Sequence, residues 1–140
     1  MEMKMEKDHT LHILICGGRH YNDYELLKST VSSYISVHGF EPQNIEIISG
    51  HCPGADMLGE QFAQEHNIKV KLFPAQWKQF GKAAVPIRNK QMVDYLNSFK
   101  HKAVIAFVSP NSQGTRYTIT LAKRMAIDVL VTEYASAEKK

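Results

Sequence analysis

Apolar positions along the chain follow two alternating patterns. Five short runs rich in β-branched and aliphatic residues have the length of buried strands, and they cover residues 11–16, 45–49, 68–73, 103–108 and 127–132. Between these runs, four longer segments repeat apolar residues at helical spacing, and they cover residues 23–38, 55–66, 87–99 and 115–126. Strands that alternate with helices are typical of a parallel sheet with right-handed crossover connections.

This alternation predicts one α/β domain over residues 11–132. We expect a Rossmann-like three-layer sandwich, in which helices cover both faces of a five-stranded parallel sheet of order 3-2-1-4-5. That order reverses between the first and fourth strands. Residues 1–10 and 135–140 lack either periodicity and are expected to be flexible tails. Residues 74–86 form a connection that is long for this fold, and long loops are often functional.

Composition and charge narrow the class of protein. The chain has 140 residues, of which 44% are hydrophobic and 22% charged, so a soluble globular domain is expected. We find no apolar stretch of membrane-spanning length and no signal peptide, which predicts a cytoplasmic protein without a membrane partner. Cys16 and Cys52 lack the spacing of a metal site, so neither a metal nor a defined cofactor is expected.

The loops that follow the strands contain the candidate chemistry, because ligands of open α/β sheets bind beyond the carboxyl ends of the strands. These loops read GGRHYND, GHCPGAD, PAQWKQFGKAAVPIRN and SPNSQGTR. Each contains glycine and opens a helix, whose free N–H groups and positive dipole end attract anions. In any single loop the glycines are explained equally well by tight turns. Several such loops at one edge favour a ligand site.

Four cations lie in these loops or in the first turn of the next expected helix. They are Arg19, Lys82, Arg88 and Arg116. A cation in a first turn opposes the helix dipole by about 0.3–1 kcal/mol. A bound anion would offset this repulsion at Arg88, and an ion pair with Asp94 or Asp56 is the alternative. The net charge of +3 is too small to indicate nucleic acid by itself.

Several other loop residues have two interpretations each. Asp56 either caps a helix or accepts hydrogen bonds from ribose hydroxyls. Ser49 and Thr115 either donate to phosphate or cap helices. Three aromatic residues either stack on a nucleobase or fold back onto the core, and they are Tyr21, Trp77 and Phe80.

Together these loops resemble the YspA-like (cpYpsA-related) branch of the SLOG superfamily, named for DprA and the LOG enzymes. The resemblance runs from about Leu11 to Val131, and FPAQWKQFGKAAVPIRNKQM is its most specific part. It implies a Rossmann-like sheet that binds a nucleotide or a nucleotide-derived small molecule. With Tyr21 and Lys82 from the loop pattern, the predicted ligand-binding residues are Gly17, Gly18, Arg19, Tyr21, Ser49, Gly50, Gly54, Ala55, Asp56, Lys82, Arg88, Asn89, Met92, Gly114 and Thr115.

The resemblance favours a binding module or sensor over an enzyme. LOG-type phosphoribohydrolases have a glutamate in PGGxGTxxE, and this chain has Thr118 there, although Arg88 matches the arginine that partners this glutamate. The first alternative is an N-glycosidic hydrolase of nucleoside monophosphates, with Asp56 and Arg88 as candidate catalytic residues. The second is DprA-like binding of single-stranded DNA, which the absence of a broad basic stripe disfavours. The sequence leaves the oligomeric state open, a homo-oligomer included.

Overall fold

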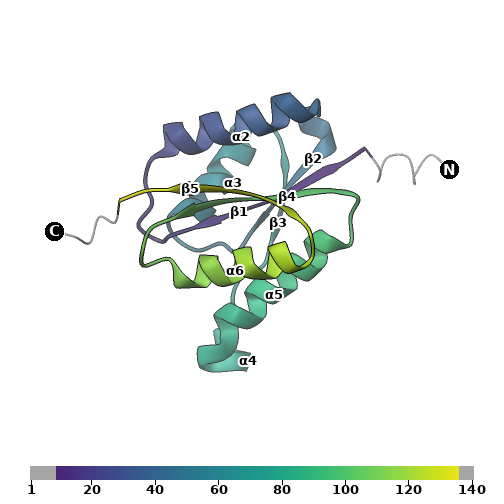
Figure 1. Ribbon diagram of the computed structural model, residues 1–140. Coiled ribbons are helices and arrows are strands. Elements are labelled where there is room, and N and C mark those ends of the chain that lie inside the picture. The colour runs from purple at the N-terminus through teal and green to yellow at the C-terminus, as the bar shows by residue number, and fades with distance from the viewer. Residues whose placement is uncertain (1–8, 136–140) are drawn as a thin grey trace.

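Five parallel strands form a single sheet in the computed structural model, which describes residues 9–135 (Figure 1). The strands are β1 (Leu11–Gly17), β2 (Ile45–Ser49), β3 (Lys69–Leu72), β4 (His101–Val108) and β5 (Asp128–Glu133). Their order is β3-β2-β1-β4-β5, which confirms the predicted sheet and its reversal between β1 and β4. The predicted tails lie outside the described residues, except for residues 9, 10 and 135.

Helices cover both faces of this sheet, as predicted. Figure 1 shows α2 (Tyr24–His38) and α3 (Ala55–Glu65) on one face, with α5 (Ala84–Asn97) and α6 (Gln113–Arg124) on the other. A short helix α4 (Trp77–Phe80) extends beyond α5, and two 3₁₀ turns, η1 (Pro42–Asn44) and η2 (Gly81–Ala83), complete the elements of the described chain.

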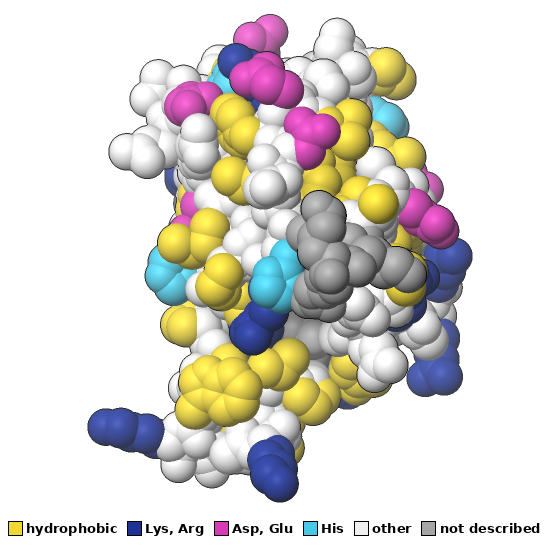
Figure 2. Space-filling view, turned by 90° about the vertical axis from the view of Figure 1, so that its left-hand side faces the viewer, with side chains coloured by type: hydrophobic (Ala, Val, Ile, Leu, Met, Phe, Trp, Pro, Cys, Tyr) yellow, Lys and Arg dark blue, Asp and Glu magenta, His cyan; other side chains and the backbone are white. Residues whose placement is uncertain are grey.

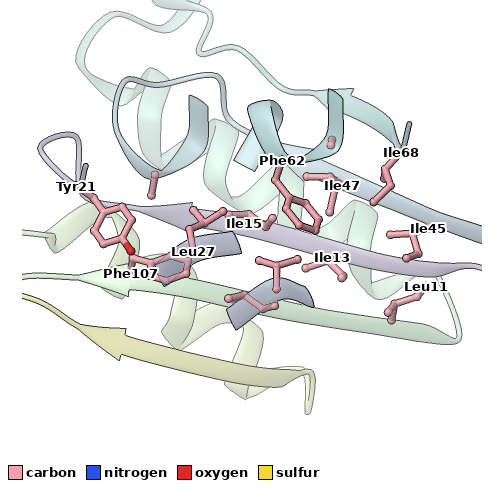
Figure 3. Packing of buried hydrophobic residues seen from close by; sticks show 14 residues of the cluster. Leu11, Ile13, Ile15, Tyr21, Leu27, Ile45, Ile47, Phe62, Ile68 and Phe107 are labelled. Atoms are coloured by element: carbon pink, nitrogen blue, oxygen red, sulfur yellow. The ribbon is translucent and has the colours of Figure 1, made fainter. Parts of the chain in front are cut away.

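The core consists of two layers, because successive strand residues point to opposite faces of the sheet. Figure 3 shows the first layer, in which Ile13 and Ile15 of β1 lie in one cluster with Leu27 of α2 and Phe62 of α3. In the second layer, Leu14 of β1 lies in the cluster contributed mainly by α5, β4 and α6. β1 is therefore buried on both faces, and the loop that follows it begins at the centre of the sheet edge.

The start and end of α2 follow the local sequence. The Asp23 carboxylate accepts a hydrogen bond of 3.1 Å from the Leu26 N–H, so Asp23 is the N-cap that the sequence predicts. Gly39 ends the helix with φ 73°, the left-handed conformation that glycine adopts without steric cost.

The prediction of a long loop over residues 74–86 is wrong. The segment contains α4 and η2, and α5 begins at Ala84, three residues before the predicted start of this helix. Proline is compatible with this early start, because the first-turn N–H that Pro86 lacks has no intrahelical partner. Arg88 consequently lies in the second turn of α5, where the dipole has weakened. The argument from dipole repulsion therefore does not apply to Arg88.

Gly17 ends β1 where no larger residue fits. A Cβ atom on Gly17 would collide with the carbonyl oxygen of Phe107 and would lie 2.7 Å from Cβ of Ala55. We expect Gly17→Ala to lower the free energy of unfolding by about 1–3 kcal/mol, because backbone on one side and a helix on the other must move. Urea denaturation measures this loss. Gly114→Ala is the matched control, since its Cβ would meet nothing closer than 3.8 Å, and a loss of equal size there would contradict the prediction.

Candidate functional site

A polar pocket with a volume of about 210 Å³ lies at the carboxyl edge of the sheet. It is formed by the loops after β1, β2 and β4 together with the start of α5, at the reversal between β1 and β4. The structure brings most of the predicted ligand-binding residues together in its wall. These are Gly17, Gly18, Arg19, Asp56, Arg88, Asn89, Met92, Gly114 and Thr115. Arg19 and Arg88 therefore face the same space.

Tyr21, which the sequence places among the ligand-binding residues, does not line this pocket. Its side chain is 3% exposed and packs against Phe107 and Tyr134, with ring centroids 4.8 and 4.9 Å away. Its hydroxyl donates a 2.7 Å hydrogen bond to the Asp23 carbonyl. The aromatic ring thus contributes to the core and is closed to a nucleobase.

Ser49 and Lys82 also lie outside the pocket lining. Ser49 is fully buried, and its hydroxyl donates a 2.7 Å hydrogen bond to the Glu60 carboxylate. The same carboxylate contacts His51 Nδ1 at 3.0 Å, and His51 adopts the left-handed conformation at φ 62°. Ser49 therefore fixes the loop after β2. Lys82 is exposed on η2, next to the start of α5.

The remaining predicted residues support the wall from behind. A Cβ atom on Gly50 would lie 2.6 Å from Nη1 of Arg88, so only glycine leaves room for the guanidinium. Gly54 has φ 87° and lies against the backbone of Gly18. The Ala55 N–H donates to the Gly18 carbonyl at 3.3 Å, which uses one first-turn amide of α3 within the protein. These residues position the lining without forming it.

Arg88 is the most unusual side chain of the pocket, because its guanidinium is buried without an acidic partner. The residue is 4% exposed. Its Nη1 donates to the carbonyls of Gly50 (2.6 Å) and Phe73 (3.2 Å), and Nε donates to Asn89 Oδ1 (2.7 Å). Nη2 has only a weak 3.5 Å contact with Cys52 Sγ. Among residues 9–135, no carboxylate oxygen lies within ion-pairing distance of Arg88.

Asn89 connects this arginine to the next helix. Its Oδ1 accepts from Arg88 Nε, and its Nδ2 donates a 3.2 Å hydrogen bond to the Gly114 carbonyl at the start of α6. The amide thereby fixes the direction of the guanidinium and links α5 to the part of the pocket wall that α6 forms.

Asp56 is the buried acid of the pocket. Burial is the main influence on its carboxyl and raises its pKa from the ordinary value of 3.8 to about 7. The nearby Arg88 charge and a 3.3 Å hydrogen bond from the Cys52 N–H lower this pKa, whereas Glu60 raises it. At neutral pH the carboxyl is therefore divided between its neutral and charged forms, the condition in which a side chain can transfer protons.

The first turn of α6 forms another part of the pocket wall. Gln113, Gly114 and Thr115 line the pocket there, and first-turn N–H groups have no intrahelical acceptor. Thr118, which stands where LOG enzymes have their glutamate, also lines the pocket. It is 1% exposed, and its hydroxyl donates to the Gly114 carbonyl at 3.4 Å. This side of the pocket thus offers amides and a hydroxyl and no carboxylate.

Several lining residues were not among the predicted ligand-binding residues, namely Cys16, Cys52, Val85, Asn111, Ser112 and Gln113. Thr118 was singled out only as the residue at the position of the LOG glutamate. For Ser112 and Gln113 a signal existed, because they adjoin Gly114 in the loop already singled out. For Cys16 there was none, since it ends an ordinary apolar strand. Burial raises the pKa of the Cys16 thiol far above its ordinary value, so this thiol stays neutral.

Residues 9–135 contain neither a metal-binding cluster nor a membrane-spanning helix. No group of three or more histidine, cysteine, aspartate or glutamate side chains is arranged to hold a metal ion in this part of the chain. No helix among the same residues is long and apolar enough to cross a membrane.

The sheet order and the polar pocket at its reversal define a Rossmann-like α/β domain. The chain belongs to the YspA, cpYpsA-related SLOG family (YAcAr), whose model matches residues 11–80. This match includes Gly17, Gly18, Arg19 and Asp56 and ends before Arg88. No curated protein and no solved structure shows significant similarity to the chain. Membership of this family suggests binding of a nucleotide derivative or a related function.

Proposed function

We propose that this protein is a binding module or sensor for a nucleotide or nucleotide-derived ligand, with a phosphate group of the ligand in the pocket. The observation that carries this proposal is the buried guanidinium of Arg88, which has no carboxylate partner among the described residues. A buried charge is costly unless it is paired. A phosphate next to Nη2 supplies a full negative charge and a strong hydrogen-bond acceptor.

Other parts of the pocket support an anionic ligand. The residues of the first turn of α6 line the same pocket as Arg88, and helix N-termini attract phosphate. Arg19 adds an exposed cation to the lining. Among the described residues, Asp56 is the only one with a carboxyl group in the lining, and its raised pKa means that protonation reduces its repulsion of an anion.

Isothermal titration and thermal unfolding test this proposal with inorganic phosphate, ribose 5-phosphate and the four ribonucleoside 5′-monophosphates. A ligand at 100 times its Kd should raise the free energy of unfolding by about 2.7 kcal/mol. The absence of binding heat and of a thermal shift with every one of these compounds would contradict the proposal.

Hydrolysis of an N-glycosidic bond is the second candidate function, and the raised pKa of Asp56 favours it. A carboxyl with a pKa of about 7 can act as a general acid or base at neutral pH. Incubation with the four monophosphates, followed by chromatography of the free bases, tests this function. A rate equal to that in buffer, or a rate that Asp56→Asn leaves unchanged, rules out this role of Asp56.

A further inference from the structure

The pocket is too small to enclose a whole nucleotide. Its volume of about 210 Å³ is below the range of roughly 300–1,000 Å³ that is usual for pockets enclosing a small-molecule ligand. In the proposed complex, the phosphate and its sugar occupy the space next to Arg88, and the base lies outside it. The surface beside the pocket then decides how the base is held.

The segment between β3 and α5 begins and ends at the pocket. At its start, the Phe73 carbonyl accepts a 3.2 Å hydrogen bond from Arg88 Nη1. At its end, Val85 in the first turn of α5 lines the pocket. Trp77 opens α4 between these two points, four residues after Phe73. Because consecutive Cα atoms are 3.8 Å apart, the chain keeps Trp77 within about 15 Å of Phe73.

Trp77 has no packing role that accounts for its presence. It is 58% exposed, and α4 contributes no buried residue. Within the described chain, its indole ring has no stacking partner and no hydrogen bond. Lys78 and Lys82 are exposed in the same segment. Figure 2 shows the side of the molecule that lies on the left in Figure 1. Hydrophobic side chains gather on the lower part of this side, with Lys or Arg side chains above and below them.

We propose that Trp77 stacks on the base of the nucleotide whose phosphate lies in the pocket. This inference rests on the proposed function. A base has an aromatic face that an exposed indole can cover, and one such stack contributes enough to change affinity measurably. Lys78 and Lys82 favour the same surface, because they attract the negatively charged ligand. Tyr21 is buried in the core and cannot perform this role.

Tyr117 provides a matched control. It is an aromatic residue of similar exposure, 40%, and lies in a separate groove between α5 and α6 together with Ile87 and Lys90. Its replacement by alanine removes exposed aromatic surface without touching the segment between β3 and α5.

The single tryptophan of the sequence makes the experiment direct, because the intrinsic tryptophan fluorescence comes from Trp77 alone. The four ribonucleoside 5′-monophosphates and ribose 5-phosphate are titrated, with binding measured by calorimetry and stacking by fluorescence quenching. We expect at least one monophosphate to quench the fluorescence, and ribose 5-phosphate to bind without quenching. Trp77→Ala should lower the affinity for that monophosphate about tenfold or more. The same variant should leave the affinity for ribose 5-phosphate unchanged. Trp77→Phe and Tyr117→Ala should retain most of the monophosphate affinity.

The outcomes separate this inference from the proposed function. Equal monophosphate affinity of wild type and Trp77→Ala would overturn the stacking and leave the phosphate pocket standing. Equal losses for ribose 5-phosphate and the monophosphate in Trp77→Ala would also overturn it, because the side chain would then act on the fold of the pocket. If wild type binds none of the probes, the proposed function fails and the stacking fails with it.

Discussion

The stability advantage of the wild type over an Asp56→Asn variant should shrink as the pH rises from 4 to 8, by on the order of 4 kcal/mol. The folded protein holds this proton with a pKa of about 7, and the unfolded chain holds it with the ordinary value of 3.8. Between these values the folded state binds more protons than the unfolded state. The contribution of Asp56 to stability is therefore fully present below pH 4 and is lost as the pH rises through 7.

Urea denaturation of both proteins at pH 4, 6 and 8 measures this difference. Other titrating groups occur in both proteins and largely cancel in the comparison. One is Glu46, whose pKa is lowered by hydrogen bonds from His12 and Tyr95 against the opposing effect of burial. Asp94→Asn is the matched control, because it makes the same change at a side chain that is 49% exposed. If the difference in free energy of unfolding between wild type and Asp56→Asn stays constant with pH, the Asp56 carboxyl does not have a raised pKa in the folded protein.

The affinity of the pocket for anions should also depend on the protonation state of Asp56. A phosphate in the pocket is repelled by charged Asp56 and accepted more readily when this carboxyl is neutral. Relative to Asp56→Asn, the wild type should therefore gain affinity for ribose 5-phosphate between pH 8 and pH 6, because the titration of the ligand's own phosphate is the same for both proteins.

An Arg88→Met variant should lose phosphate affinity by about a hundredfold or more. Hydrogen bonds to charged groups each contribute roughly 1.5–3 kcal/mol, and Arg88 combines such a donor with the buried positive charge of the pocket. The substitution also removes the partner of the carbonyls of Gly50 and Phe73, so some loss of stability accompanies it. Calorimetric titration with inorganic phosphate and ribose 5-phosphate measures the affinity.

Two further variants separate the role of Arg88 in binding from its role in folding. Arg88→Lys keeps the charge, and a partial recovery of phosphate affinity is expected because one ammonium replaces the planar fork. Arg124→Met replaces arginine by methionine at an exposed position in the last turn of α6. The phosphate affinity of this variant should match that of the wild type. Undiminished binding by a folded Arg88→Met protein would remove Arg88 from the site.

Much of the architecture followed from the sequence by itself. The five apolar runs and four periodic segments correspond to the strands and principal helices, because periods of about two and 3.6 residues report which positions face a core. Parallel pairing follows from the alternation of strands with helices, and the order β3-β2-β1-β4-β5 is the usual order of a Rossmann-like sheet. Parallel pairing places the loops after β1, β2 and β4 at one edge, so Arg19, Asp56 and Gly114 were expected to lie together.

Only the tertiary structure decided what each of these side chains does. Tyr21 lies in the loop after β1, yet its ring is part of the core because Phe107 and Tyr134, both remote in sequence, pack against it. Arg88 is held by the carbonyls of Gly50 and Phe73, which come from two other loops, and among residues 9–135 it has no ion-pair partner. The pKa of Asp56 depends on its burial. Local spacing specifies an element and its inward face, whereas desolvation and charge depend on neighbours that the fold brings from elsewhere in the chain.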